Sequence, residues 1–162
     1  MYKILVPLDG SDHSLKALHI ACDLAHKYRA RLILLHIIDP NKKAAELLAL
    51  PIHGKFPPAL SAALHKAGSN NLFPLDPELL EQTGHSILKI AAARIKRLDL
   101  DYQILPLATG NPADNILTAH RMVAASTIVM GTRGLPPDRH KPDDSISRTV
   151  FAKADCTCIS VK

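Results

Sequence analysis

The first 38 residues constrain the fold most, because they alternate between a strand pattern and a helix pattern. Residues 3–8 form a short apolar run that is typical of a strand buried on both faces of a parallel sheet. Residues 9–11 then turn the chain, and Ser11 suits the N-cap of a helix. Apolar residues recur at helical spacing before a second apolar run at residues 31–38. This order predicts a βαβ unit with parallel strands and a right-handed crossover.

The same alternation continues along the chain. Asp76 followed by Pro77 is typical of a helix start, and Asn111 followed by Pro112 repeats that pattern. After the first unit we expect a helix at 76–98, a strand at 102–107, a helix from 111, a strand at 126–130, a helix at 145–153 and a strand at 156–161. Five strands that alternate with four helices predict an α/β fold, with an open twisted parallel sheet covered by helices on both faces. We expect a single domain over residues 1–162.

Residues 41–74 interrupt this rhythm and form a long inserted connection. The stretch is rich in proline and contains turn signals at glycine and asparagine. Two short helical pieces are expected inside it, at residues 44–50 and 58–66. A connection of this length is typical of a lid, a contact surface or a mobile excursion, and the sequence leaves these three alternatives open.

Composition excludes several classes of protein. Hydrophobic residues make up 47% and charged residues 22%, which is typical of a soluble globular chain. The net charge is +5, but the basic residues are dispersed and aromatics are only 4%, so we expect no nucleic-acid partner. No apolar run approaches the roughly 20 residues of a membrane span, and we expect no membrane partner. Three cysteines without a framework spacing fit a reducing cytosol, so the expected location is cytoplasmic.

The stretch from Met130 to Gly134 is the strongest candidate for a ligand site. Gly131 and Gly134 follow a strand directly, where glycine permits positive φ and a close approach to a ligand. A helix begins near Ser145, and the N–H groups at its start suit an anion such as phosphate. The alternative is a strand-to-helix connection that needs glycine only for turning. Ligands of open α/β sheets bind beyond the carboxyl ends of the strands, where this stretch is expected, and this location favours a ligand.

Four segments in this order and spacing resemble the universal stress protein family. They are residues 4–11 (ILVPLDGS), 34–39 (LLHIID), 110–112 (GNP) and 128–134 (IVMGTRG). The resemblance covers nearly the whole chain apart from residues 41–74. It implies a five-stranded sheet in the order 3-2-1-4-5, a homodimer, and in one branch of the family a pocket for an adenine nucleotide, ATP or AMP.

The resemblance also implies roles for individual residues. Asp9 and the backbone of Ile37 would hold adenine or ribose, while Pro7 and Leu8 would line the pocket. Met130, Gly131 and Gly134 would face ribose and phosphates, and Ser145 and Ile146 would offer N–H groups at the last helix. Gly110 and Arg133 complete the expected nucleotide-binding residues.

Asp144 departs from the family pattern, which has glycine before the serine. As a helix N-cap, Asp144 would contribute about 1 kcal/mol to stability and fill the anion site with its own carboxylate. Its charge would repel a phosphate about 4 Å away by roughly 1–4 kcal/mol. Asp143 adds to this repulsion, whereas Arg133, Arg139 and Lys141 oppose it. Alternatively, Mg²⁺ could bridge Asp144 and the phosphates.

Two functions follow from these alternatives. The first is a stress-response protein that binds ATP or AMP, with or without Mg²⁺, at the carboxyl ends of the first and fourth strands, and acts as a nucleotide-linked regulator or sensor. The second is a dimeric protein-interaction module that binds no ATP. No P-loop, Gly-x-Ser-x-Gly elbow or His-Glu-x-x-His motif occurs, so no catalytic residue is assigned and at most slow ATP hydrolysis is expected.

The last strand, residues 156–161, is expected to mediate dimerisation. If it lies at an unpaired sheet edge, pairing with the same strand of a second copy would cover it. Cys156 and Cys158 are two residues apart and share one face, where an apolar role is favoured over a metal site. His36 is expected to be a buried, hydrogen-bonded residue, with a pH-sensing role left open.

Overall fold

The computed structural model describes residues 1–132 and 145–162. Its main sheet has the strand order β4-β2-β1-β6-β7, and every pair of neighbours is parallel. With the short strands β3 and β5 set aside, this is the predicted order 3-2-1-4-5. The five strands are β1 (Lys3–Pro7), β2 (Arg31–Leu35), β4 (Tyr102–Ile104), β6 (Thr127–Gly131) and β7 (Thr157–Val161).

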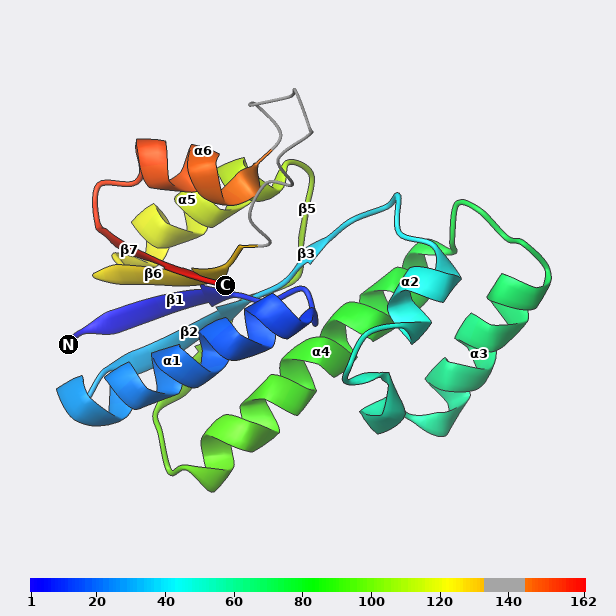
Figure 1. Cartoon of the computed structure of the whole chain (residues 1–162), viewed down its shortest axis with the longest axis horizontal. Helices are drawn as coiled ribbons and strands as arrows, with labels where there is room; N and C mark the ends of the chain where they lie inside the picture. The colour runs from blue at the N-terminus through cyan, green and yellow to red at the C-terminus, as the bar shows by residue number, and fades with distance from the viewer. Residues whose placement is uncertain (133–144) are drawn as a thin grey trace.

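Helices cover both faces of the sheet, as predicted (Figure 1). On one face, Ile4 and Val6 of β1 pack in a core cluster with residues of α1 (Asp12–Tyr28) and α4 (Pro77–Arg97). On the other face, Leu5 packs with residues of α5 (Pro112–Val123) and with Val150 of α6 (Ile146–Lys153). Alternation along β1 therefore divides its side chains between two cores, which explains its continuous apolar sequence.

Side-chain capping marks where α1, α4, α5 and α6 begin. In each case the N-cap side chain accepts a hydrogen bond from a backbone N–H of the first turn, and these N-caps are Ser11, Asp76, Asn111 and Ser145. The N-cap of α6 is thus Ser145, so the interpretation in which Asp144 caps this helix is wrong. Asp144 itself lies outside the described residues.

Two predicted strands are shorter in the structure than in the sequence pattern. The run at residues 31–38 divides into β2 and β3 (Ile37–Ile38), and the run at 102–107 contributes only β4. Leu105 N–H still donates to Leu34 O at 2.9 Å, but Pro106 has no N–H to continue the ladder. Beyond it, β5 (Ala108–Thr109) pairs with β3 in a separate two-stranded sheet, which the sequence pattern did not predict.

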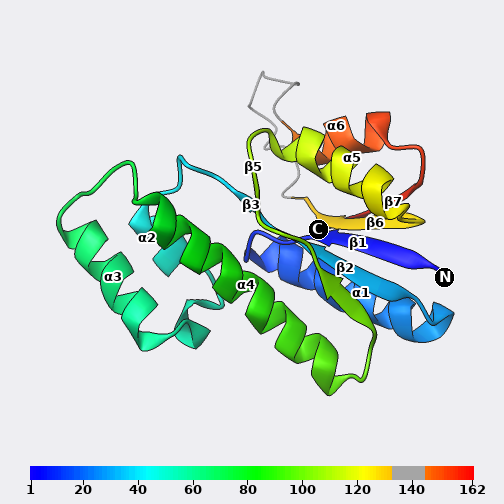
Figure 2. The same cartoon turned by 180° about the vertical axis from the view of Figure 1, so that it is seen from behind.

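The inserted connection is a packed helical layer. It contains α2 (Ala44–Leu48), the short 3-10 helix η1 (His53–Lys55) and α3 (Pro58–Ser69), close to the two predicted helical pieces. Figure 2 shows these helices beside α4, beyond the carboxyl ends of β1 and β2. Buried side chains join this layer to the core on the α1 and α4 side, and they include Leu47, Ile52, Phe56, Leu60 and Leu64. Among the described residues, no helix is both long and apolar enough to cross a membrane.

Candidate functional site

The chain just after β1 is held by two consecutive residues of the neighbouring strand region. Leu8 N–H donates to Leu35 O at 2.8 Å, and Leu8 O lies 2.7 Å from His36 Nδ1. The next residue, Asp9, is exposed, and its Oδ1 accepts from Ser11 N–H at 2.9 Å and from Ser11 Oγ at 2.5 Å. The carboxylate therefore has a defined orientation at the carboxyl edge of the sheet, where it also organises the start of α1.

Ile37 presents its backbone toward this same region. Ala108 N–H donates to His36 O at 3.1 Å, which places the peptide groups of His36 on the β5 side of the chain. Because peptide groups alternate in direction along an extended chain, the N–H and C=O of Ile37 point to the opposite side, past the end of β1. This pair can donate one hydrogen bond and accept another side by side.

The end of β6 explains why position 131 is glycine. A Cβ added at Gly131 would lie 2.6 Å from His13 O and 2.7 Å from Ser14 N, within the first turn of α1. Gly131 does not have the positive φ that is found at Gly10 and Gly110. Its lack of a side chain therefore serves the close packing of α1 against β6, in addition to any approach by a ligand.

Hydroxyl groups join the end of β6 to the start of α6. Thr132 N–H donates to Val161 O at 2.8 Å and extends the pairing with β7. Ser147 Oγ donates to Thr132 Oγ1 at 3.2 Å and lies 3.1 Å from Ser145 Oγ. Ser145 Oγ in turn accepts from Arg148 N–H at 3.4 Å. Thr132 and Ser147 were not predicted as site residues, although each adjoins a predicted one, Gly131 and Ile146.

The remaining predicted residues fall into three groups. Leu8 and Met130 are 3% and 5% exposed and lie in the two cores, so neither side chain is open to a ligand. Pro7 is half-buried, and Gly110 is exposed in a turn after β5 with a φ of 99°. Ile146 is 43% exposed on the first turn of α6.

Arg133 and Gly134 lie outside the described residues, as do Asp143 and Asp144. The described part of the candidate site thus comprises two clusters at the carboxyl edge. One is the end of β1 with β3, held together through Leu35 and His36, and the other is the end of β6 with the start of α6. The first turn of α1 lies between them, because it contacts both Asp9 and Gly131.

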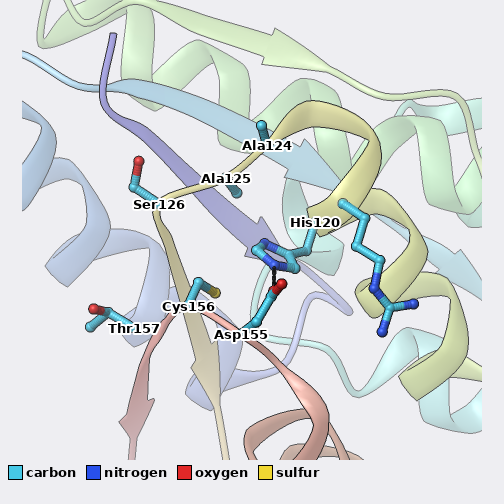
Figure 3. Close-up of a pocket in the computed structure, with 8 residues that line it drawn as sticks. His120, Ala124, Ala125, Ser126, Asp155, Cys156 and Thr157 are labelled. Atoms are coloured by element: carbon cyan, nitrogen blue, oxygen red, sulfur yellow. Dashed lines mark hydrogen bonds and ion pairs between the residues drawn. The ribbon is translucent and has the colours of Figure 1, made fainter.

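An open depression of about 730 Å³ lies at the opposite, amino edge of the sheet (Figure 3). Its lining includes His120, whose Nε2 is 2.5 Å from Asp155 Oδ1, and this hydrogen bond holds the pKa of Asp155 below its usual value. Burial raises the pKa of the neighbouring Cys156 thiol to about 11, so the thiol stays protonated near neutral pH. Among the described residues, no three acidic, histidine or cysteine side chains gather as metal ligands. None of the predicted site residues that the structure describes lines this depression.

The fold and the carboxyl-edge site define an open α/β protein of the kind that binds ligands where the strand order reverses. A model of the universal stress protein family matches residues 1–162. The chain belongs to the universal stress protein family.

Two curated relatives match over almost their full length. A Thermus aquaticus protein, the universal stress protein in the QAH/OAS sulfhydrylase 3' region, is 30% identical over 163 residues, with 100% of both chains covered. The stress response protein NhaX of Bacillus subtilis is 28% identical, with 99% of this chain and 97% of NhaX covered.

Solved structures of universal stress proteins share the fold. A complex with cAMP has a TM-score of 0.65 at 20% identity, covering 99% of this chain and 95% of that chain. The Archaeoglobus fulgidus protein with dAMP has a TM-score of 0.64 at 20% identity, covering 100% and 98%. An Arabidopsis thaliana protein with AMP bound has a TM-score of 0.61 at 15% identity, covering 100% and 92%. At these identities the similarity establishes the fold.

Proposed function

We propose that this universal stress protein binds an adenine nucleotide at the carboxyl ends of β1 and β6 and acts as a nucleotide-linked regulator or sensor. The observation that carries the proposal is that the Asp9 carboxylate and the Ile37 peptide groups lie at the same edge of the sheet, joined through the contacts of Leu8 with Leu35 and His36. The nucleotide complexes of the structurally similar proteins add support, since their ligands are AMP, dAMP and cAMP.

Each part of the nucleotide has a chemical counterpart at this edge. A neighbouring N–H and C=O, as at Ile37, complement the ring nitrogen acceptor and the amino group of adenine. The Asp9 carboxylate can accept hydrogen bonds from ribose hydroxyls, as acidic residues do at other dinucleotide sites. The first turn of α6 offers backbone N–H groups to phosphate, and the hydroxyls of Thr132, Ser145 and Ser147 lie beside it.

We also propose a homodimer formed through β7, and a cytoplasmic location. β7 is the last strand in the sheet order, and Cys158, Ile159 and Val161 on it are only partly buried. Three unpaired cysteines fit a reducing compartment. The alternative function, a dimeric interaction module without ATP, rests on Asp144 and shares this dimer.

Calorimetric titration of the protein with adenosine, AMP and ATP, each with and without Mg²⁺, tests the proposal. We expect all three ligands to bind, because the adenosine contacts are common to them. Absence of binding by every ligand at millimolar concentration would leave the dimeric module as the function. If ATP binds no more tightly than adenosine, the phosphate contacts contribute nothing, and Asp144→Gly should then raise the affinity for ATP but not for adenosine.

A further inference from the structure

His36 joins three elements beside the candidate site. It follows β2 directly and is only 8% exposed. Its side chain reaches Leu8 O at the end of β1, while its backbone C=O accepts from Ala108 N–H of β5. A carbonyl oxygen can only accept, so the ring must carry its hydrogen on Nδ1, and the Nδ1–H donates to Leu8. One residue thereby links β1 to the small β3–β5 sheet.

The far side of the ring is held by α4. A Cβ added at Gly84 would lie 2.7 Å from His36 Cδ2 and 3.1 Å from His36 Nε2. The same Cβ would lie 3.1 Å from Leu107 Cδ2. The absence of a side chain at Gly84 therefore creates the space that the imidazole occupies, and the ring cannot move toward α4 without meeting its backbone. His36 is fixed between a hydrogen bond on one side and a helix on the other.

The contact between Leu8 and His36 directly precedes, in both segments of the chain, the two residues proposed to bind adenosine. Asp9 follows Leu8, and Ile37 follows His36. Leu8 is bonded at both of its peptide groups, through N–H to Leu35 and through C=O to His36. The distance between the Asp9 carboxylate and the Ile37 peptide groups is consequently set through His36.

We propose that His36 is a positioning residue for the adenosine part of the nucleotide, holding Asp9 and Ile37 at the separation that adenine and ribose need. This inference rests on the proposed nucleotide-binding function. It predicts that His36 contributes to affinity for adenosine and ATP alike, because its contacts lie at the end of β1 and not at the start of α6. A residue that served only to fill the core would be replaced by leucine without loss of affinity in the folded protein.

Two substitutions at His36 separate these roles. In His36→Asn, the amide Nδ2 stands near the position of the ring Nδ1 and can still donate to Leu8 O, whereas His36→Leu keeps the volume and removes the donor. We expect His36→Leu to lower the affinity for adenosine and for ATP by the same factor, about fivefold or more. His36→Asn should recover most of that lost affinity. His65→Leu on the exposed face of α3 is the matched control and should bind as wild type does. Ser145→Ala should lower the affinity for ATP without lowering the affinity for adenosine.

The outcomes distinguish the inference from the function on which it rests. If wild-type protein binds neither ligand, the proposed function fails and the role of His36 fails with it. If wild type binds both and His36→Leu binds equally well, only the role of His36 is wrong. A ¹⁵N spectrum of the wild-type imidazole provides a test that needs no variant. Saturating adenosine should shift the His36 Nδ1 resonance while inorganic pyrophosphate should not, and an unchanged resonance with bound adenosine would overturn the inference.

Discussion

At the scale of single residues, the carboxyl edge is built from groups that already have structural partners. The Asp9 carboxylate organises the turn at Ser11, and the peptide groups of Leu8 are both hydrogen-bonded. Such groups lose little conformational freedom when a ligand arrives, which favours binding. Sequence reasoning identified Asp9 as a site residue and His36 as buried and hydrogen-bonded, and the structure confirms the burial and the hydrogen bond of His36. The hydrogen bond of His36 to Leu8, the residue before Asp9, joins positions 28 apart in the chain, so local pattern could not predict it.

Gly131→Ala should destabilise the protein, because the new Cβ would meet the backbone of His13 and Ser14 in α1. Backbone cannot move aside as a flexible side chain can, so we expect a loss of roughly 1–3 kcal/mol or more in the free energy of unfolding. Urea unfolding followed by circular dichroism measures it. Gly54→Ala is the control, since a Cβ there would have no atom within 4 Å. Equal unfolding midpoints for both variants would refute the packing role of Gly131.

His36 should make stability depend on pH. Burial lowers the pKa of His36, while the hydrogen bond to Leu8 and the charge of Asp9 oppose this shift and His85 adds to it. The unfolded chain therefore takes up a proton near pH 6.5, and the folded chain takes it up only at lower pH. Between these two pH values the unfolded state holds more protons, so the free energy of unfolding falls as the pH drops below about 6.5.

The contribution of His36 can be isolated by comparing wild type with His36→Leu in urea unfolding between about pH 5 and pH 7. The variant cannot take up this proton, so wild type should lose stability on acidification more steeply than the variant does. A difference between the two proteins that stays constant with pH would contradict a lowered pKa of His36.

At the level of helices and strands, a helix start depends on nearby residues, whereas a strand end depends on the neighbouring strand. The N-caps Ser11 and Asp76 were predictable because each acts on backbone groups two or three residues away. The ends of β2 and β4 were predicted too late in the chain, because a strand ends where its neighbour stops pairing. Pro106 was visible in the sequence, but its effect on pairing depends on which strand lies beside it.

Gly84→Ala should destabilise the protein, although alanine usually stabilises a helix relative to glycine. Alanine ordinarily stabilises a helix interior by up to about 1 kcal/mol relative to glycine. At Gly84 the added Cβ would press on His36, whose ring is held by Leu8, and overpacking of this kind costs roughly 1–3 kcal/mol. We therefore expect a net loss of stability in thermal or urea unfolding.

Gly68→Ala in α3 is the matched control for Gly84→Ala. A Cβ at Gly68 would lie 3.5 Å from Ala44 Cβ, which is ordinary van der Waals contact, so this variant should be neutral or stabilised. If Gly84→Ala is as stable as Gly68→Ala, the ring of His36 has more freedom than the packing implies.

In the whole molecule, the proposed ligand site lies at the carboxyl edge of the sheet, and the proposed dimer surface lies along its last strand, β7. The carboxyl edge gathers the candidate nucleotide site, and the inserted helices lie beyond it and contact the turn after β1. A Cβ added at Gly10 would lie 3.1 Å from Leu50 and 3.3 Å from Ile52. The residues of the insertion form a packed layer that shares the core with α4. The last strand in the sheet order, β7, is the candidate surface for a second copy.

Ser160→Pro should convert the proposed dimer into a monomer while leaving the sheet intact. Val161 O accepts from Thr132 N–H, so alternation directs the peptide groups of Ser160 to the outer edge of β7. Proline there removes only an outward N–H and blocks the addition of another strand. Sedimentation equilibrium should report a dimer for wild type and for Ser160→Ala, and a monomer for Ser160→Pro. If Ser160→Pro is still a dimer, the interface does not lie at the edge of β7. If the wild type is a monomer, the proposed dimer is wrong.

The succession of the five main strands, the helices between them and the parallel sheet could be predicted from sequence, because hydrophobic period and capping act over a few residues. The resemblance to the universal stress protein family rested on four segments of the chain, and the match of the family model to residues 1–162 confirmed it. The packed structure was needed to explain two glycines and one pair of hydrogen bonds. Gly131 leaves room for α1, and Gly84 leaves room for the ring of His36. Leu8 is hydrogen-bonded through its N–H to Leu35 and through its C=O to His36. These are contacts between elements distant in the chain, and their atoms meet only when the sheet and its helices have packed together.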